Sequence, residues 1–157
     1  MIIGIAAVDR KGAIGKGGKL PWHYSADMKF FRETTTGHAV VMGRKTWLTI
    51  GKPLKNRLNI VLSRDSSIEP QESLLVLGDV ESALSFYKSL TTDLFVIGGA
   101  QIYRAFLSHI EKWIITEVPL TVRGADAFMP EGYLDGFEVV DSRDLGDDLI
   151  VKVYSRG

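Results

Sequence analysis

Residues 94–103 read LFVIGGAQIY: a short apolar run ends at two adjacent glycines, and the spacing of a helix begins directly after them. The run at 94–97 is typical of a buried strand, and the pattern at 100–107 is typical of a helix. Paired glycines let backbone N–H groups approach a ligand closely, and a helix start favours an anion such as phosphate. The stretch therefore predicts a strand–turn–helix unit near a nucleotide. A plain tight turn is the alternative, because the stretch matches neither GxGxxG nor a P-loop.

Short apolar runs also occur on both sides of this stretch, and each predicts a strand. They cover residues 2–8, 39–42, 58–63, 74–77, 113–118, 137–140 and 149–154. The other candidate helices cover residues 25–35, 44–49 and 80–89, and Ser25 is the expected N-cap of the first. Helices and strands alternate up to residue 113, and several strands are apolar throughout. This pattern favours an α/β fold in which helices cover both faces of a mainly parallel sheet, with hairpins or longer loops after residue 113.

Composition restricts the class of protein. The 157 residues suit one domain over 1–157, large enough to bury its own core. Nineteen acidic and nineteen basic residues balance, so no nucleic acid or membrane partner is expected. The chain has no cysteine, and His23, His38 and His109 are far apart, so no metal is expected either. The apolar N-terminus is too short to cross a bilayer, and we expect a soluble, cytoplasmic monomer.

Cations stand where a predicted strand meets a predicted helix. Arg44 and Lys45 open a helix, where the helix dipole disfavours positive charge, and Arg64 directly follows the next strand. Neighbouring parallel strands end at the same edge of a sheet, so the three side chains could surround one phosphate. Three solvated surface cations are the alternative interpretation.

Asp27 lies in LPWHYSADMKFF, residues 20–31, among aromatic and apolar neighbours. If Ser25 caps the helix, Asp27 falls in the first turn and shares a face with Phe30 and Phe31. The carboxylate could simply stabilise the helix dipole. Burial between aromatic rings would instead raise its pKa and make it costly, unless a ligand with paired N–H groups binds it.

Arg57 is a lone arginine that leads into an apolar strand, within LKNRL at residues 54–58. Its planar guanidinium could hold a carboxylate through two parallel hydrogen bonds. A surface cation is the more frequent explanation of such a residue. The sequence alone leaves both interpretations open.

Taken in order, these motifs resemble bacterial-type dihydrofolate reductase along essentially the whole chain. The matching stretches are AAVDRKGAIG (6–15) with LPW (20–22), the acid at 27, VVMGRKTW (40–47), IGKPLKNRLNIVLSR (50–64), FVIGGAQIY (95–103), IITEV (114–118) and GADAFMP (124–130). The resemblance implies an eight-stranded, mostly parallel central sheet with an antiparallel C-terminal strand and four main helices. It also implies reduction of 7,8-dihydrofolate to 5,6,7,8-tetrahydrofolate by hydride from NADPH, which supplies one-carbon metabolism, and a site for antifolates.

The resemblance also assigns roles to single residues. The catalytic group is Asp27, which binds the pterin, with Thr116 supporting that contact and Trp22 holding a water beside it. The implied substrate-binding residues are Ile5, Met28, Phe31, Arg32, Ile50, Lys52, Leu54, Arg57, Ile97 and Tyr103. The implied cofactor-binding residues are Ala7, Ile14, Gly15, Leu20, Gly43, Arg44, Lys45, Thr46, Ser63, Arg64, Gly98, Gly99, Ala100, Gln101 and Ile102.

Within these sets the resemblance is more specific at several points. Arg57 would take the α-carboxylate of the glutamate tail, and Arg44, Lys45 and Arg64 would take the 2′-phosphate. Residues 15–20 would form a mobile loop over the nicotinamide, and the peptide between the two glycines would be cis.

The chain departs from the commonest family pattern at a few positions: Leu20, Ser25, Met28 and the pair Lys55-Asn56. None of these changes removes a required chemical group. Two rival functions remain at this point. A reductase of the same fold that acts on a ribosylated pyrimidine would not require Asp27 and Arg57 together. A noncatalytic NADPH-binding module would share the fold without turnover.

Overall fold

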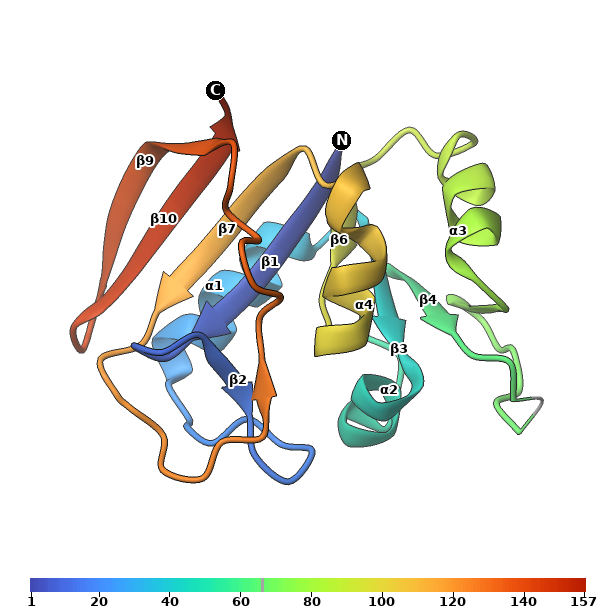
Figure 1. Ribbon diagram of the computed structural model, residues 1–157. Helices are drawn as coiled ribbons and strands as arrows, with labels where there is room; N and C mark the ends of the chain where they lie inside the picture. Colours follow the sequence, from blue (N-terminus) through green and yellow to red (C-terminus); the bar gives the residue numbers. More distant parts are fainter. Residues whose placement is uncertain (66) are drawn as a thin grey trace.

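Eight strands form the central sheet of the computed structural model, which describes residues 1–65 and 67–157 (Figure 1). They are β1 (Ile2–Val8), β3 (Ala39–Gly43), β4 (Leu58–Leu62), β5 (Leu74–Leu77), β6 (Leu94–Val96), β7 (Lys112–Glu117), β9 (Phe137–Gly146) and β10 (Leu149–Arg156). Their spatial order is β5-β4-β3-β6-β1-β7-β10-β9. Strand β10 pairs antiparallel with β7 and β9, and the other pairs are parallel. The expected eight-stranded, mostly parallel sheet with an antiparallel C-terminal strand is confirmed.

Four helices cover the two faces of this sheet. Helices α1 (Ser25–Thr35) and α2 (Arg44–Ile50) pack on one face, and α3 (Val80–Tyr87) and α4 (Ala100–Phe106) on the other. A single 3-10 turn, Leu107–His109, continues α4. The two-sided cover explains the continuous apolar runs, because successive side chains of a strand point to opposite faces. In β3, for example, Val40, Val41 and Met42 are all fully buried.

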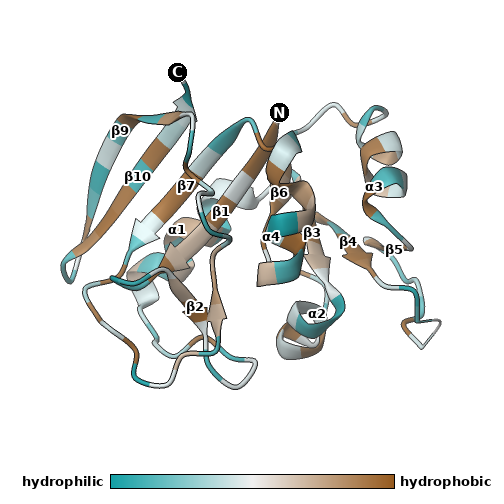
Figure 2. Ribbon diagram, viewed as in Figure 1, coloured by the Kyte–Doolittle hydropathy of each residue, from teal (hydrophilic) through white to brown (hydrophobic). Residues whose placement is uncertain are grey.

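Figure 2 shows apolar colour along the central strands, whereas the edge strand β9 carries a mixture of apolar and polar colour. Most of β9 is exposed, so hydropathy indicated a strand only over residues 137–140, although pairing with β10 continues to Gly146. A second sheet, made of β2 (Ala13–Gly15) and β8 (Ala127–Phe128), was not expected from the sequence. Its strands are two and three residues long, too short for a periodic pattern.

The start of α1 differs from the expectation. Tyr24, in an extended conformation, is the N-cap and makes no side-chain capping hydrogen bond, while Ser25 is the first helical residue. The expected capping role of Ser25 is therefore wrong, by one position. Asp27 still lies in the first turn, as expected, where its negative charge suits the positive end of the helix.

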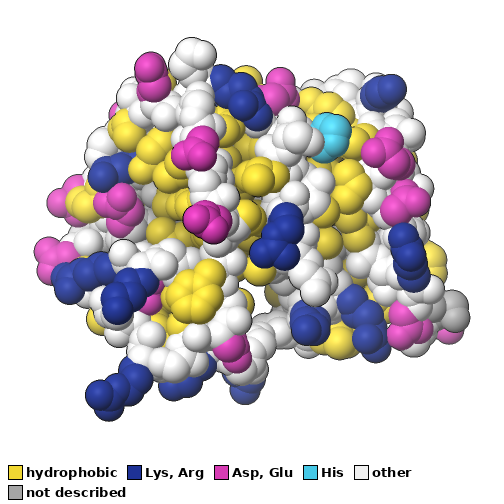
Figure 3. Space-filling view, viewed as in Figure 1, with side chains coloured by type: hydrophobic (Ala, Val, Ile, Leu, Met, Phe, Trp, Pro, Cys, Tyr) yellow, Lys and Arg dark blue, Asp and Glu magenta, His cyan; other side chains and the backbone are white. Residues whose placement is uncertain are grey.

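On the face of the molecule in Figure 3, acidic and basic side chains are interspersed. This distribution agrees with the balanced charge of the chain. Within the described residues, no helix is long and apolar enough to span a membrane.

Candidate active site

The carboxyl ends of six parallel strands lie along one edge of the sheet, in the order β5, β4, β3, β6, β1, β7. The register aligns Gly43 at the end of β3 with Leu62 at the end of β4, and Val8 with Glu117 at the ends of β1 and β7. Ligands of open α/β sheets bind at such an edge. The expected site residues at or just beyond these strand ends are Ala7, Gly43, Ser63, Arg64, Ile97, Gly98 and Thr116.

Asp27 is partly buried at the start of α1. Burial raises the pKa of its carboxyl group, while the nearby Thr116 hydroxyl lowers it. Thr116 is buried in β7, opposite Ala7 of β1. No basic side chain in the described residues forms an ion pair with Asp27. A desolvated carboxylate beside a hydroxyl, with no cation, can bind a ligand that presents paired N–H donors.

The indole Nε1 of Trp22 is buried and has no hydrogen-bond partner in the described part of the chain. A buried N–H without a partner is costly, so such groups usually bind an ordered water or a ligand. This orphaned donor fits the expected role of Trp22 in holding a water.

The apolar residues expected around the substrate share one face of the sheet. Five of them belong to or pack against the hydrophobic cluster between the sheet and helices α1 and α2: Ile5, Phe31, Ile50, Leu54 and Ile97. Met28, next to Asp27 on α1, is 55% exposed. Arg32 and Lys52 are exposed at the rim. These five apolar residues form an apolar wall. Asp27 and Arg57 lie beside this wall, at separate positions.

Tyr103 is buried and acts mainly inside the fold. Its hydroxyl donates to the carbonyl oxygen of Ile5 at 2.7 Å, which ties α4 to β1. Burial raises the pKa of Tyr103 well above its ordinary value. Its ring also lies against Gly98, where an added Cβ would come within 3.3 Å of it.

Arg57 is only 8% exposed, so the surface-cation interpretation does not hold. Its Nε donates to the carbonyl oxygen of Lys55 at 2.9 Å, and its Nη1 donates to the Thr35 hydroxyl at 3.0 Å. Burial, together with the nearby charge of Arg32, lowers the pKa of Arg57. Across residues 1–65 and 67–157, no carboxylate lies within ion-pair distance of it. A buried guanidinium without a counter-ion is suited to an anionic ligand.

The two-glycine junction is closely packed, and the peptide between Gly98 and Gly99 is cis, as the resemblance implied. The Gly43 amide donates to the Gly98 carbonyl oxygen at 2.9 Å. An added Cβ at Gly43 would lie 2.9 Å from Ile102, and one at Gly99 would lie 3.8 Å from the Thr46 hydroxyl. The first-turn amides of α4, at Ala100 and Gln101, have no partner within the helix. Backbone and hydroxyl donors thus gather where a pyrophosphate was expected.

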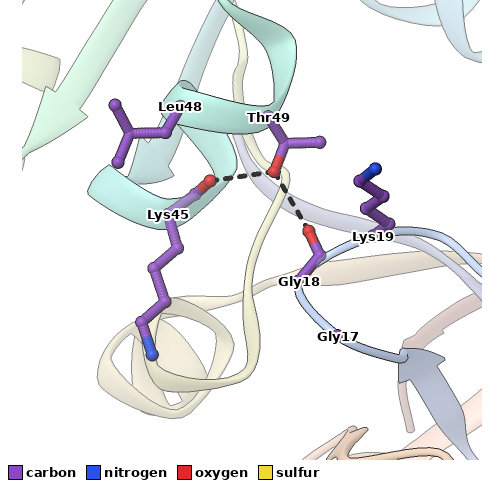
Figure 4. A pocket seen from close by; sticks show the side chains of 6 residues that line it. All are labelled: Gly17, Gly18, Lys19, Lys45, Leu48 and Thr49. Atoms are coloured by element: carbon purple, nitrogen blue, oxygen red, sulfur yellow. Dashed lines mark hydrogen bonds between the residues drawn. The ribbon is translucent and has the colours of Figure 1, made fainter.

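Next to this junction, a cleft of about 410 Å³ opens between α2 and the loop that follows β2 (Figure 4). It is lined by Gly17, Gly18, Lys19, Lys45, Leu48 and Thr49. The Thr49 hydroxyl donates to the Gly18 carbonyl oxygen at 3.0 Å. On the other side of the loop, the Gly17 amide donates to the Asp126 carboxylate at 3.0 Å. Leu20, at the end of the loop, is 59% exposed.

The three expected phosphate-binding cations are exposed at adjacent strand ends. Arg44 forms an ion pair with Asp65 at 3.2 Å. Hydrogen bonds from Ser82 lower the pKa of Asp79, and the charge of Arg64 adds a smaller effect in the same direction. Sequence reasoning identified the cations but missed Asp65, although it stands directly after Arg64.

Other contributors were also missed. Thr35 and Asn59 are buried polar residues that contact Arg57, and Thr49 and Asp126 hold the loop. A polar residue within an apolar run was the available signal for Asn59, in LNIVL. The described residues contain no group of three side chains that could hold a metal ion.

Comparisons with known proteins agree with one another. A family model described as dihydrofolate reductase matches residues 1–153. The chain is 36% identical over 135 residues to the dihydrofolate reductase of Haemophilus influenzae, covering 86% of this chain and 82% of that relative. It is 35% identical over 142 residues to the dihydrofolate reductase of Bacillus subtilis, covering 90% of this chain and 83% of that relative.

Among solved structures, the chain is similar to a dihydrofolate reductase from Enterococcus faecalis complexed with NADP(H) and RAB-propyl. The TM-score is 0.91 at 31% sequence identity, and the match covers all of this chain and 96% of that one.

Proposed function

The chain belongs to the dihydrofolate reductase family, and on that premise we propose that it reduces 7,8-dihydrofolate to 5,6,7,8-tetrahydrofolate with NADPH, supplying one-carbon metabolism. One observation carries most of this proposal. Asp27, a desolvated carboxylate, and Arg57, a buried guanidinium without a counter-ion, both stand beside the same apolar wall. The pair matches a ligand with N–H donors in its ring and a carboxylate in its tail.

Asp27 binds and orients the pterin. Its carboxylate accepts hydrogen bonds from the 2-amino group and a ring nitrogen, and the Thr116 hydroxyl supports the same contact. Ile5, Met28 and Phe31 enclose the ring together with Ile50, Leu54 and Ile97. Arg57 binds the α-carboxylate of the glutamate tail, and Arg32 and Lys52 lie near it. Antifolates that present the same paired N–H donors are expected to compete at Asp27.

Reduction requires a proton at pterin N5 as well as a hydride at C6. Asp27 does not reach N5 in this arrangement, so the proton comes from a water, which Trp22 helps to hold. The orphaned Nε1 of Trp22 supports that role. The negative charge of Asp27 raises the basicity of N5 and favours the protonated state as the hydride arrives.

The residues at the two-glycine junction fit a dinucleotide. Thr46 with the backbone of Gly98–Gln101 holds the pyrophosphate, and the backbone of Ala7 and Ile14 holds the nicotinamide carboxamide. When bound, NADPH supplies the hydride for C6. Residues 15–20 close over that position and exclude bulk water, and their reopening limits product release. That the chain is one domain, monomeric and cytoplasmic also remains a prediction.

A direct assay tests the proposal. Purified protein is mixed with NADPH and dihydrofolate, and loss of the nicotinamide absorbance is followed. Rapid loss that depends on dihydrofolate is expected. Loss of absorbance only when a ribosylated pyrimidine replaces dihydrofolate would favour the rival reductase. NADPH binding without any loss of absorbance would favour a noncatalytic module.

A further inference from the structure

A buried hydroxyl fixes the side chain of Arg57. Thr35, in the last turn of α1, is fully buried. Its hydroxyl accepts the hydrogen bond from Arg57 Nη1 at 3.0 Å and donates to the carbonyl oxygen of Phe31 at 2.9 Å. Thr35 therefore joins the guanidinium to the helix turn that carries Phe31, one of the residues proposed to enclose the substrate.

A buried amide fixes the backbone around Arg57 in the same way. Asn59, at the second position of β4, is fully buried. Its Oδ1 accepts from the Leu54 amide at 2.9 Å, and its Nδ2 donates to the carbonyl oxygens of Leu54 and Arg57, each at 3.0 Å. One side chain thus closes the turn between Leu54 and Arg57, and both residues belong to the proposed substrate site.

These contacts determine which donors of Arg57 remain for a ligand. Nε is bound to the carbonyl oxygen of Lys55, and one N–H of Nη1 is bound to Thr35. A guanidinium carries five N–H groups, so the second N–H of Nη1 and both of Nη2 are left. Because Lys55 and Thr35 hold two of its donors, the plane of the Arg57 guanidinium is fixed. Binding of a ligand therefore costs little further side-chain entropy.

Thr35 and Asn59 have no exposed surface, so neither can touch a ligand itself. We propose that both are positioning residues, which hold the Arg57 guanidinium and its turn in the orientation that selects substrates with a tail carboxylate. This inference rests on the proposed function. It assigns part of the substrate specificity to two residues that act through Arg57 and its turn.

Thr35→Val tests the inference with little change in side-chain shape. Its KM is measured for dihydrofolate and for a 7,8-dihydropterin that carries a methyl group in place of the tail. The KM for dihydrofolate should rise about tenfold or more, because a hydrogen bond to a charged group is lost. The KM for the tailless substrate, the KM for NADPH and kcat should stay close to those of the unaltered protein.

Thr36→Val is the matched control. Thr36 follows at the same helix end, and its hydroxyl likewise donates to a carbonyl oxygen four residues back, that of Arg32 at 2.6 Å. It is exposed, and the side-chain hydrogen bonds of Arg57 go to Lys55 and Thr35 and not to Thr36. The control should therefore leave the KM values for both substrates unchanged.

Further outcomes decide the question. In an Arg57→Ala background, Thr35→Val should add nothing to the KM for dihydrofolate, because the two residues act as one unit. Asn59→Ala offers an independent variant if Thr35→Val does not fold: its KM for dihydrofolate should rise more than its KM for the tailless substrate, because Asn59 holds the turn that carries Arg57. An equal rise in KM for dihydrofolate and for the tailless substrate, or no rise in either KM, would overturn the positioning role. The proposed function would still stand. Unaltered protein that reduces neither substrate would overturn the proposed function and this inference together.

Discussion

At the scale of single residues, the charge of Asp27 is unfavourable for folding, and its proposed use is to bind the substrate. Desolvation disfavours its charged form, and in the described residues no cation compensates. Proteins tolerate such groups where the charge is needed by a ligand or a reaction. This balance leads to two predictions about the same substitution.

Asp27→Asn should keep the fold and the affinity for NADPH but cut the rate of dihydrofolate reduction at neutral pH by about a hundredfold or more. The reason is the loss of a charge that favours protonated N5. Steady-state rates from neutral to acid pH check it. Activity should partly return in acid, where dihydrofolate arrives already protonated. An unchanged rate of dihydrofolate reduction at neutral pH would contradict the proposed role of Asp27.

The same variant should make the ligand-free protein more stable at neutral pH. Because the pKa of Asp27 is higher in the folded protein than the ordinary 3.8, ionisation weakens the folded state. The penalty is absent well below pH 3.8, grows as the pH rises through the ordinary pKa towards the raised one, and is then complete. Thermal unfolding at several pH values checks this. The melting temperature of Asp27→Asn should exceed that of the unaltered protein at pH 7 and match it in strong acid.

At the scale of elements, close packing between β1 and β7 depends on one missing side chain. Gly4 of β1 lies against Trp113 of β7, so that an added Cβ would overlap the indole ring. The ring also packs against Tyr103 and Tyr133, which restricts its escape.

Gly4→Ala should therefore lower the free energy of unfolding by about 1–3 kcal/mol, the usual cost of overpacking a core. Denaturant unfolding followed by fluorescence measures it. Gly78→Ala is the control, because nothing lies within 4 Å of the added Cβ and the backbone there needs no positive φ. It should change the stability by less than about 0.5 kcal/mol. Equal effects for both variants would refute the packing argument.

The elements also show where sequence reasoning succeeds and fails. Runs such as 39–42 and 58–63 were identifiable because burial on both faces of the sheet demands continuous apolar residues. The polar half of β9 carried no such pattern, since it is an exposed edge strand held by backbone pairing with β10. Thr35 and Asn59 were missed because their importance lies in tertiary hydrogen bonds to Arg57, which no local spacing reveals.

At the scale of the whole molecule, the site exists because distant segments meet at one sheet edge. Thr116 of β7 comes near Asp27 of α1 although the two are far apart in the sequence, and Arg64 is near Arg44 because β4 lies beside β3. Hydropathy predicted a parallel sheet but not this strand order. The family resemblance added the antiparallel C-terminal strand, while the order of the strands comes from the structure.

The zero net charge of the whole chain predicts how salt affects the binding of the cofactor. Because no strong global field attracts anions, salt should act on cofactor binding through local phosphate contacts. NADPH affinity should therefore fall more with salt than NADH affinity. Fluorescence titrations of both cofactors at low and high salt measure the difference.

The Arg44→Ala, Arg64→Ala double variant completes this test. It should bring the two dissociation constants close by weakening NADPH alone, with hydride transfer from the saturated complex nearly normal. A double variant that kept the full preference for NADPH would place the phosphate site elsewhere.

If Arg44 binds the 2′-phosphate of the cofactor as expected, its ion pair with Asp65 makes cofactor binding an exchange of one anion for another. A 2′-phosphate that takes Arg44 displaces a resident anion, so its net gain is the difference between two pairings. NADH would leave the original pairing undisturbed. In that case the carboxylate of Asp65 would neutralise Arg44 between turnovers and would pair with it again when the oxidised cofactor leaves. The selectivity for NADPH over NADH and the release of the oxidised cofactor would then both depend on Asp65. A change that strengthened one of them would weaken the other.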